Sequence, residues 1–281
     1  MLSYRHGFHA GNHADVLKHF VLVQLLRQLT NKDKPLWVID THAGAGVYSL
    51  EQGFAVRNAE FKTGIGRLWS RRDLPAALAD YVDQVRQVNP DGALRVYPGS
   101  PQIALQVTRA QDRLRLFELH TSESRALQEH FAGAGRRVAI VAGDGLKGLK
   151  AVLPPPSRRG LALIDPSYEL VADYRAVRAA IRDALARFAT GTYAVWYPQL
   201  RRPESASLPD QLLRLAPGDW LHVWLRVKAP TTAGFGLHGS GLFVFNPPWG
   251  LETGLRAAMP TLVDALGQDP HAAFELTFRQ T

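Results

Sequence analysis

The sequence predicts an α/β protein with a mostly parallel, doubly wound sheet of seven strands. Short apolar runs typical of buried strands alternate along the chain with segments whose apolar residues recur at helical spacing. The seven predicted strands span residues 36–40, 113–119, 136–143, 160–165, 191–198, 220–228 and 241–246. A glycine-rich loop, rather than a helix, joins the last two. We therefore expect those two strands to form an antiparallel pair at the sheet edge.

The helical patterns add an N-terminal helix and an insertion to this sheet. Within residues 1–30, Asn12 followed by Asp15 resembles a helix cap ahead of an apolar stripe. Residues 50–98 make the first crossover much longer than the roughly 30 residues of an ordinary βαβ unit. They contain helical patterns, so we interpret them as a small helical insertion within a single domain, 1–281. Ser100 and Pro101 then resemble the N-cap and first residue of the next helix.

Composition narrows the class of protein. Of the 281 residues, 46% are hydrophobic, which supports a packed core and argues against disorder. Lys and Arg outnumber Asp and Glu by 33 to 25, a balance that suits a polyanionic partner without requiring one. The absence of cysteine excludes disulfides, thiolate metal sites and a cysteine nucleophile. No apolar run approaches the roughly 20 residues that span a bilayer, so we expect a cytoplasmic protein without membrane contact.

A glycine loop, DTHAGAG at 40–46, follows the first predicted strand. Dinucleotide-binding loops carry a third glycine that allows tight helix packing against a pyrophosphate site. Here Gly44 and Gly46 are followed by no such glycine, which disfavours a nicotinamide oxidoreductase. S-adenosylmethionine has no pyrophosphate and needs only a close approach of the backbone, so the loop favours that cofactor.

Two acids sit where this cofactor needs acceptors. Glu118 ends the second predicted strand and is placed to accept hydrogen bonds from both ribose hydroxyls. Asp144 follows the third strand and is placed to meet the adenine amino group. The alternative is that loops at strand ends are rich in Gly and Asp for turn-forming reasons alone.

The stretch Asp165-Pro166-Ser167-Tyr168 ends the fourth predicted strand and suits methylation of an exocyclic amine. The lone pair of adenine N6 is delocalised into the ring. A carboxylate and a carbonyl that accept hydrogen bonds from its two N–H groups would favour a tetrahedral nitrogen able to attack a methyl group. Asp165 and the carbonyl of Pro166 are predicted to be those acceptors, and Tyr168 is predicted to stack on the flipped base. A plain strand-ending turn with a packed tyrosine is the structural alternative.

A second copy of this pattern, Asn246-Pro247-Pro248-Trp249, matches the signature more closely by residue type. It ends the last predicted strand, which should lie far from the strand that carries the glycine loop. The reactive acid belongs beside that loop, near the point where the strand order reverses. We therefore interpret Asn246 to Trp249 as a structural turn.

The chain resembles the bacterial 23S ribosomal RNA adenine-N6 methyltransferase family. The resemblance extends over nearly the whole length, in motifs that occur in the same order: MLSYRHGFHAGNHADVLKH, DTHAGAG, YPGSP, SRRGLALIDPSYE, FATGTYAVWYP and NPPW. It implies a Rossmann-like class I methyltransferase fold with a helical insertion. It also implies the use of S-adenosylmethionine, methylation of one adenine of large-subunit RNA, and no metal. Ser167 departs from the second proline of the usual Asp/Asn-Pro-Pro-Tyr/Phe signature.

The resemblance also implies roles for individual residues. Together with the glycine loop it gives a set of cofactor-binding residues: His19, His42, Gly44, Ser100, Glu118, Gly143, Asp144 and Asp165. Asp165 is implied to be the catalytic acceptor, and Tyr4, His6 and Lys18 are implied to lie at the RNA. The partner would be 23S ribosomal RNA, free or early in assembly, and the protein a monomer.

Three alternatives remain open from the residues themselves. The histidines at positions 6, 9, 13 and 19 suggest a metal site, but they share no single ligating face and no carboxylate cluster completes them. A DNA adenine methyltransferase would use the same chemistry, because this signature does not sense the 2′-hydroxyl. A noncatalytic RNA-binding protein would keep the basic charge, with activity lost through Ser167.

Overall fold

The protein folds around one eight-stranded sheet. The computed structural model describes residues 6–52, 58–230 and 236–280. The strands run in the order β10-β8-β9-β7-β6-β1-β4-β5. Their bounds are β1 (Trp37–Asp40), β4 (Arg113–Glu118), β5 (Val138–Ala142), β6 (Gly160–Ile164), β7 (Thr192–Gln199), β8 (Trp220–Arg226), β9 (Gly239–Phe245) and β10 (Ala273–Arg279). The five strands from β7 to β5 are parallel, whereas β9, β8 and β10 join by antiparallel pairing.

The fold class is confirmed, but the expectation of seven strands is wrong by one. The eighth strand is β10, whose segment AFELTFR alternates apolar and polar residues as an edge strand does. Strands β8 and β9 are antiparallel as expected, yet they do not form the edge by themselves. Strand β9 pairs with β7, and β10 covers the outer side of β8.

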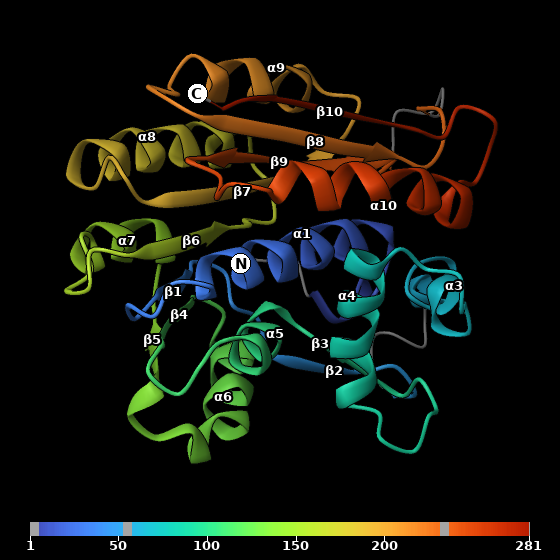
Figure 1. Ribbon diagram of the computed structural model, residues 1–281, viewed down its shortest axis with the longest axis horizontal. Coiled ribbons are helices and arrows are strands. Elements are labelled where there is room, and N and C mark those ends of the chain that lie inside the picture. Colours follow the sequence, from blue (N-terminus) through green and yellow to red (C-terminus); the bar gives the residue numbers. More distant parts are fainter. Residues whose placement is uncertain (1–5, 53–57, 231–235, 281) are drawn as a thin grey trace.

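Helices cover both faces of this sheet and form two apolar cores (Figure 1). One core contains residues of α1 (His13–Thr30), α4 (Ala76–Gln87), α5 (Ser100–Val107), α6 (Thr121–His130) and α10 (Leu251–Leu266). The other contains residues of α7 (Gly145–Val152), α8 (Val171–Arg187) and α9 (Pro203–Leu213). Among the described helices none is long and apolar enough to cross a bilayer.

Helix α1 crosses the middle of the molecule between α10 and α5 (Figure 1). Its N-cap is Asn12, as predicted, and the Asn12 side chain accepts hydrogen bonds from the backbone N–H groups of Ala14 and Asp15. The helix is buried on nearly all sides over its first three turns. Its polar residues there, including Lys18, are consequently inside the protein.

The predicted helical insertion is confirmed in its described part. It holds η2 (Glu60–Thr63), α3 (Gly66–Trp69) and α4, and its ends are joined by antiparallel pairing of β2 (Val47–Ser49) with β3 (Val96–Pro98). Two further short helices are η1 (His6–Phe8) and η3 (Ala132–Arg137). Gly64 lets the insertion approach the N-terminal segment, because a Cβ at this position would lie 2.0 Å from the carbonyl oxygen of Gly11.

The expected role of Ser100 as a helix N-cap is wrong. Gly99 is the N-cap of α5, and Ser100 is the first helical residue, next to Pro101. The Ser100 hydroxyl instead donates a 2.6 Å hydrogen bond to Oδ2 of Asp40. A serine that precedes a proline is therefore used here to connect α5 to the end of β1.

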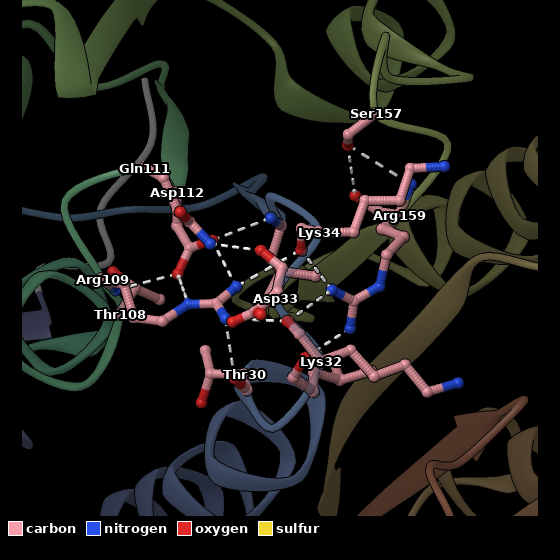
Figure 2. A network of polar contacts seen from close by, with 12 residues as sticks. Thr30, Lys32, Asp33, Lys34, Thr108, Arg109, Gln111, Asp112, Ser157 and Arg159 are labelled. Atoms are coloured by element: carbon pink, nitrogen blue, oxygen red, sulfur yellow. Dashed lines mark hydrogen bonds and ion pairs between the residues drawn. The ribbon is translucent and has the colours of Figure 1, made fainter.

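At the amino edge of the sheet, two arginine side chains donate hydrogen bonds to the backbone of the turn that follows α1 (Figure 2). Arg109 donates to the carbonyls of Thr30 and Lys32, at 2.9 and 2.7 Å, and Arg159 donates to the carbonyls of Lys32 and Lys34. Arg109 is itself held by Asp112, whose side chain is 0% exposed. These contacts give the Arg159 side chain a structural role that involves no nucleic-acid phosphate.

Asp112→Ala should lower the free energy of unfolding by about 2–3 kcal/mol. The Asp112 carboxylate accepts from the backbone N–H of Leu36 and from the backbone and side chain of Arg109, so its removal leaves buried donors unpaired. Urea unfolding monitored by circular dichroism measures the change. Asp33→Ala, in the exposed part of the same turn, is the matched control and should change stability by less than about 0.5 kcal/mol. Equal effects of the two substitutions would contradict this account.

Candidate active site

Four acids meet at the carboxyl edge of the parallel strands. Asp40 ends β1, Glu118 ends β4, Asp144 lies just beyond β5, and Asp165 follows β6 directly. Strand β1 pairs in parallel with both β4 and β6, so the acids at the ends of these three strands are neighbours. This edge is where α/β proteins with open sheets place their ligands.

The glycine loop is fastened to the end of β4. The backbone N–H of Gly44 donates to Oε2 of Glu118 at 2.8 Å, and the N–H of His120 donates to Oε1 at 2.7 Å. Gly44 has φ +62°, and a Cβ there would lie 2.1 Å from the hydroxyl of Tyr48. Only glycine fits this position, so the loop backbone lies close to whatever occupies the adjacent space.

A cavity of about 260 Å³ opens beside this loop. It brings together ten of the residues singled out from the sequence, namely His6, Lys18, His19, His42, Gly44, Ser100, Glu118, Asp144, Asp165 and Pro166. Gly143 does not line it, although its N–H donates to the carbonyl of Glu118 and joins the ends of β4 and β5. Tyr4 lies outside the described residues.

Lys18 links helix α1 to the end of β6. Its ammonium lies 2.5 Å from Oδ2 of Asp165 and 2.9 Å from Oδ1 of Asp15. Oδ2 of Asp15 in turn accepts from the N–H of Gly11 and contacts Nε2 of His6 at 3.0 Å. Oδ1 of Asp165 accepts no hydrogen bond from any residue in the described part of the chain, so one carboxylate oxygen faces the site unengaged.

The two carboxylates around Lys18 differ in acidity. Burial alone would raise the pKa of Asp15, but the charges of His6 and Lys18 outweigh it and hold this pKa well below its ordinary value. At Asp165 burial dominates and raises the pKa, with Lys18 opposing the rise. Asp15 therefore stays ionised as a fixed counter-charge, whereas the ionisation of Asp165 depends on Lys18.

Two histidines line the same cavity as neutral rings. Burial lowers the pKa of His42 to about 4 and holds the pKa of His19 well below its ordinary value. Nδ1 of His19 makes a 2.8 Å hydrogen bond with the hydroxyl of Tyr97. Its Nε2 is buried and has no hydrogen-bond partner among the described residues. Such an unpartnered ring nitrogen is available to a bound ligand.

Sequence reasoning missed Asp40 and Asp15. Asp40 is 2% exposed, accepts from Ser100 and from the N–H of His42, and holds the start of the glycine loop from behind the cavity. Burial raises its pKa to about 6. The signal was present, because Asp40 ends a predicted strand as Glu118 does. Asp15 had been assigned only to the helix cap.

A second cavity, of about 500 Å³, meets the first at four shared residues, His6, Lys18, Asp165 and Ser167. Its other walls come from distant parts of the chain. Glu60 comes from the insertion, Trp196 from β7, and Lys228 from the segment after β8. Asp165 therefore lies at the junction of two cavities. One is beside the glycine loop, and the other is lined in part by residues between His6 and Lys18.

Tyr168 does not lie where base stacking requires it. Its ring is 1% exposed, packs against Tyr174 at a centroid distance of 4.7 Å, and donates its hydroxyl to the carbonyl of Trp196. It lines neither cavity. The sequence pattern did not reveal this because Tyr168 has φ +53°, a left-handed conformation that turns the chain at this residue.

Asn246 lies at the opposite edge of the sheet from Asp165, because β9 runs antiparallel to β7. Its side-chain amide donates to the carbonyls of Ala189 and Gly191, both at 2.7 Å. The segment from Asn246 to Trp249 is thus a structural turn. Within the described ranges, no group of three or more His, Asp or Glu side chains is arranged to hold a metal ion.

The fold and the clustering of these acids define a Rossmann-like methyltransferase. The family model described as "Ribosomal RNA large subunit methyltransferase D, RlmJ" matches residues 33–278, and the chain belongs to this family.

Individual relatives agree with this assignment. Ribosomal RNA large subunit methyltransferase J of Escherichia coli (strain K12) is 47% identical over 262 residues, 93% of each chain. Its counterpart of the same name in Haemophilus influenzae is 45% identical over 267 residues, 95% of this chain and 94% of the relative. A crystal structure of a Legionella pneumophila protein superposes with a TM-score of 0.88 at 35% identity, covering 96% of this chain and 98% of that one.

The raised pKa of Asp40 predicts a pH-dependent difference in stability. Between its unfolded value near 3.8 and about 6 the folded state binds more protons than the unfolded state, so ionisation of Asp40 lowers the free energy of unfolding as pH rises. In Asp40→Asn this contribution is absent. From pH 4 to pH 7 the variant should gain about 1–3 kcal/mol relative to the unsubstituted protein in urea unfolding. A difference that is constant with pH would disprove the assignment.

Proposed function

We propose that the protein transfers a methyl group from S-adenosylmethionine to the N6 amine of an adenine in 23S ribosomal RNA. The observation that carries the proposal is the position of Asp165 at the junction of two cavities, with one carboxylate oxygen unengaged. The large-subunit ribosomal RNA methyltransferases among its relatives support the substrate class.

We assign the cavity beside the glycine loop to the methyl donor. When bound, S-adenosylmethionine supplies an electrophilic methyl group on a sulfonium. Glu118 would accept from the ribose hydroxyls, while Asp144, which caps α7, would accept from the adenine amine. The apolar side chains of Leu119 and Leu146 line the same space. His19 would donate from Nε2 to the carboxylate of the donor, because its Nδ1 is engaged by Tyr97.

The second cavity would receive the flipped adenine. Oδ1 of Asp165 and the carbonyl of Pro166 would accept hydrogen bonds from the two N–H groups of N6. These contacts would direct the nitrogen lone pair toward the methyl group. Lys18 opposes the burial that raises the pKa of Asp165 and so favours the ionised form for this task. Most of the rate enhancement would come from such positioning, with proton acceptance after methyl transfer.

The aromatic contact to the base falls to Trp196 rather than Tyr168. Trp196 lines the second cavity, and the ammonium of Lys18 lies 5.9 Å from its ring centroid. Tyr168 would act indirectly, because its hydroxyl holds the carbonyl of Trp196 and its turn positions Pro166 and Ser167. Base–aromatic stacking of this kind contributes about 1–3 kcal/mol.

The test of substrate class is a methylation assay with a labelled donor. Total RNA from a strain that lacks the protein should accept label at one adenine, and mapping by mass spectrometry identifies it. Naked 23S RNA and assembly particles, compared side by side, show which form is used. We expect free RNA or an early intermediate to be methylated by a monomeric protein in the cytoplasm. Preferential labelling of DNA would favour a DNA adenine methyltransferase instead.

Asp165→Ala should lower methyl transfer by about 100- to 10,000-fold while the protein stays folded. The variant should fold because Lys18 keeps its contact with Asp15. Initial rates with labelled donor and RNA measure the effect, and circular dichroism checks the fold. Asp183→Ala, on the half-exposed surface of α8, removes a carboxylate of the same type and should leave the rate unchanged. Near-normal turnover by Asp165→Ala would overturn the mechanism.

Lys18→Met should move the acidic limb of the pH–rate profile toward higher pH. In the proposed mechanism, ionised Asp165 accepts a hydrogen bond from the N6 amine. Without Lys18, the burial that raises the pKa of Asp165 is no longer opposed. The profile of kcat/KM from pH 5 to pH 9 measures the shift. Lys18→Arg keeps the charge and should keep the limb in place. An unchanged limb in Lys18→Met would show that Asp165 does not set it.

A further inference from the structure

Among the described residues, Lys228 is the charged side chain of the second cavity that has no ion-pair partner. Its acids are Asp15, Glu60 and Asp165. Asp15 and Asp165 contact Lys18, while Glu60 contacts Nδ1 of His9 at 3.0 Å. Lys228 also lines the cavity, and it makes no ion pair with any residue in 6–52, 58–230 or 236–280.

The backbone around Lys228 is held on both sides. The N–H of Gln268 donates to the carbonyl of Val227 at 2.7 Å, and the N–H of Ala229 donates to Oδ2 of Asp269 at 2.8 Å. The N–H groups of Val227 and Lys228 both point to the carbonyl of His238, across the β8–β9 connection. A lysine with this support presents its ammonium from a fixed backbone, which lowers the entropic cost of binding an anion.

A second unpartnered group lies on the same cavity wall. Nδ1 of His13 is buried and has no hydrogen-bond partner in the described part of the chain. Burial lowers the pKa of His13 to about 4, and the charge of Lys228 acts in the same direction. His13 is therefore a neutral ring near Lys228, able to donate one N–H to an acceptor. It is also the first residue of the 18-residue helix α1, whose positive dipole end faces this space.

These features have the chemistry of an anion site. A lysine ammonium, a neutral imidazole N–H and a helix N-terminus all favour a negatively charged oxygen. Each acid of the same cavity already contacts Lys18 or His9, and in the described part of the chain none of them forms an ion pair with Lys228. A purine base is neutral, so a base alone leaves this charge unused, whereas a nucleotide brings a phosphate together with its base.

We propose that Lys228, with His13 beside it, binds a backbone phosphate next to the target adenosine and so positions the flipped nucleotide. The identity of the anion as an RNA phosphate rests on the proposed function. The phosphate would fix the nucleotide within the cavity, while the contacts of Asp165 and Pro166 orient its amine. Lys228 is thus a positioning residue for the substrate and touches no reacting atom.

The test compares the binding of adenosine, adenosine 5′-monophosphate and adenosine 3′-monophosphate by calorimetry. The unsubstituted protein should bind at least one monophosphate about tenfold more tightly than adenosine. In Lys228→Ala this advantage should fall below about twofold, and Lys228→Arg should restore most of it. Lys32→Ala removes an exposed lysine at the opposite edge of the sheet and should retain the full advantage.

A kinetic measurement adds an independent readout. For RNA methylation, Lys228→Ala should raise KM without lowering kcat, and it should reduce the slope of log affinity against log salt concentration by about one. Equal binding of adenosine and both monophosphates to the unsubstituted protein would overturn the proposal. A phosphate advantage that survives in Lys228→Ala would also overturn it. Since nucleotide binding is measured without turnover, failure of the site differs visibly from absence of methyl transfer.

Discussion

The site depends on one buried cation between two carboxylates. Burying the ammonium of Lys18 among apolar side chains would be costly by itself, and a single partner would repay only part of that cost. Asp15 on the same helix and Asp165 at the end of β6 together neutralise it. Because Asp165 belongs to the sheet and Lys18 to α1, this contact also sets how the N-terminal helix lies over the carboxyl edge. Fold and site are therefore stabilised by the same charges.

The parallel sheet explains how much of the site could be predicted from the sequence. Residues that follow parallel strands must gather at one edge, so Gly44, Glu118, Asp144 and Asp165 could be placed together from strand order alone. The same reasoning separated Asp165 from its rival Asn246, whose strand runs the other way. The N-terminal motif was placed only by family resemblance, because the pattern of an amphipathic helix does not reveal which of its polar residues turn inward.

What the sequence did not reveal depends on backbone direction and on distant contacts. Tyr168 follows Asp165 at the expected spacing, but its left-handed conformation sends the ring into the core. The walls of the second cavity come from Glu60, Trp196 and Lys228, which no local pattern brings together. Strand β10 was missed although its alternation was visible, since an edge strand after a long helix has no neighbouring strand in the sequence to indicate its partner.

The contact with Lys18 also constrains what Asp165 can do chemically. Burial raises the pKa of Asp165, but the 2.5 Å hydrogen bond from the Lys18 ammonium opposes that rise, so the carboxylate is a weaker base than it would be without Lys18. In the proposed reaction, adenine N6 is so weak an acid that the Asp165 carboxylate would not deprotonate it before methyl transfer, with or without the contact to Lys18. A carboxylate whose ionised form Lys18 favours is nonetheless well suited to accept a hydrogen bond from an N–H group and to direct a lone pair. For the proposed reaction, the electrostatics of the site therefore favour orientation of the amine over its prior deprotonation, and the proton would leave only after methylation had made the nitrogen cationic.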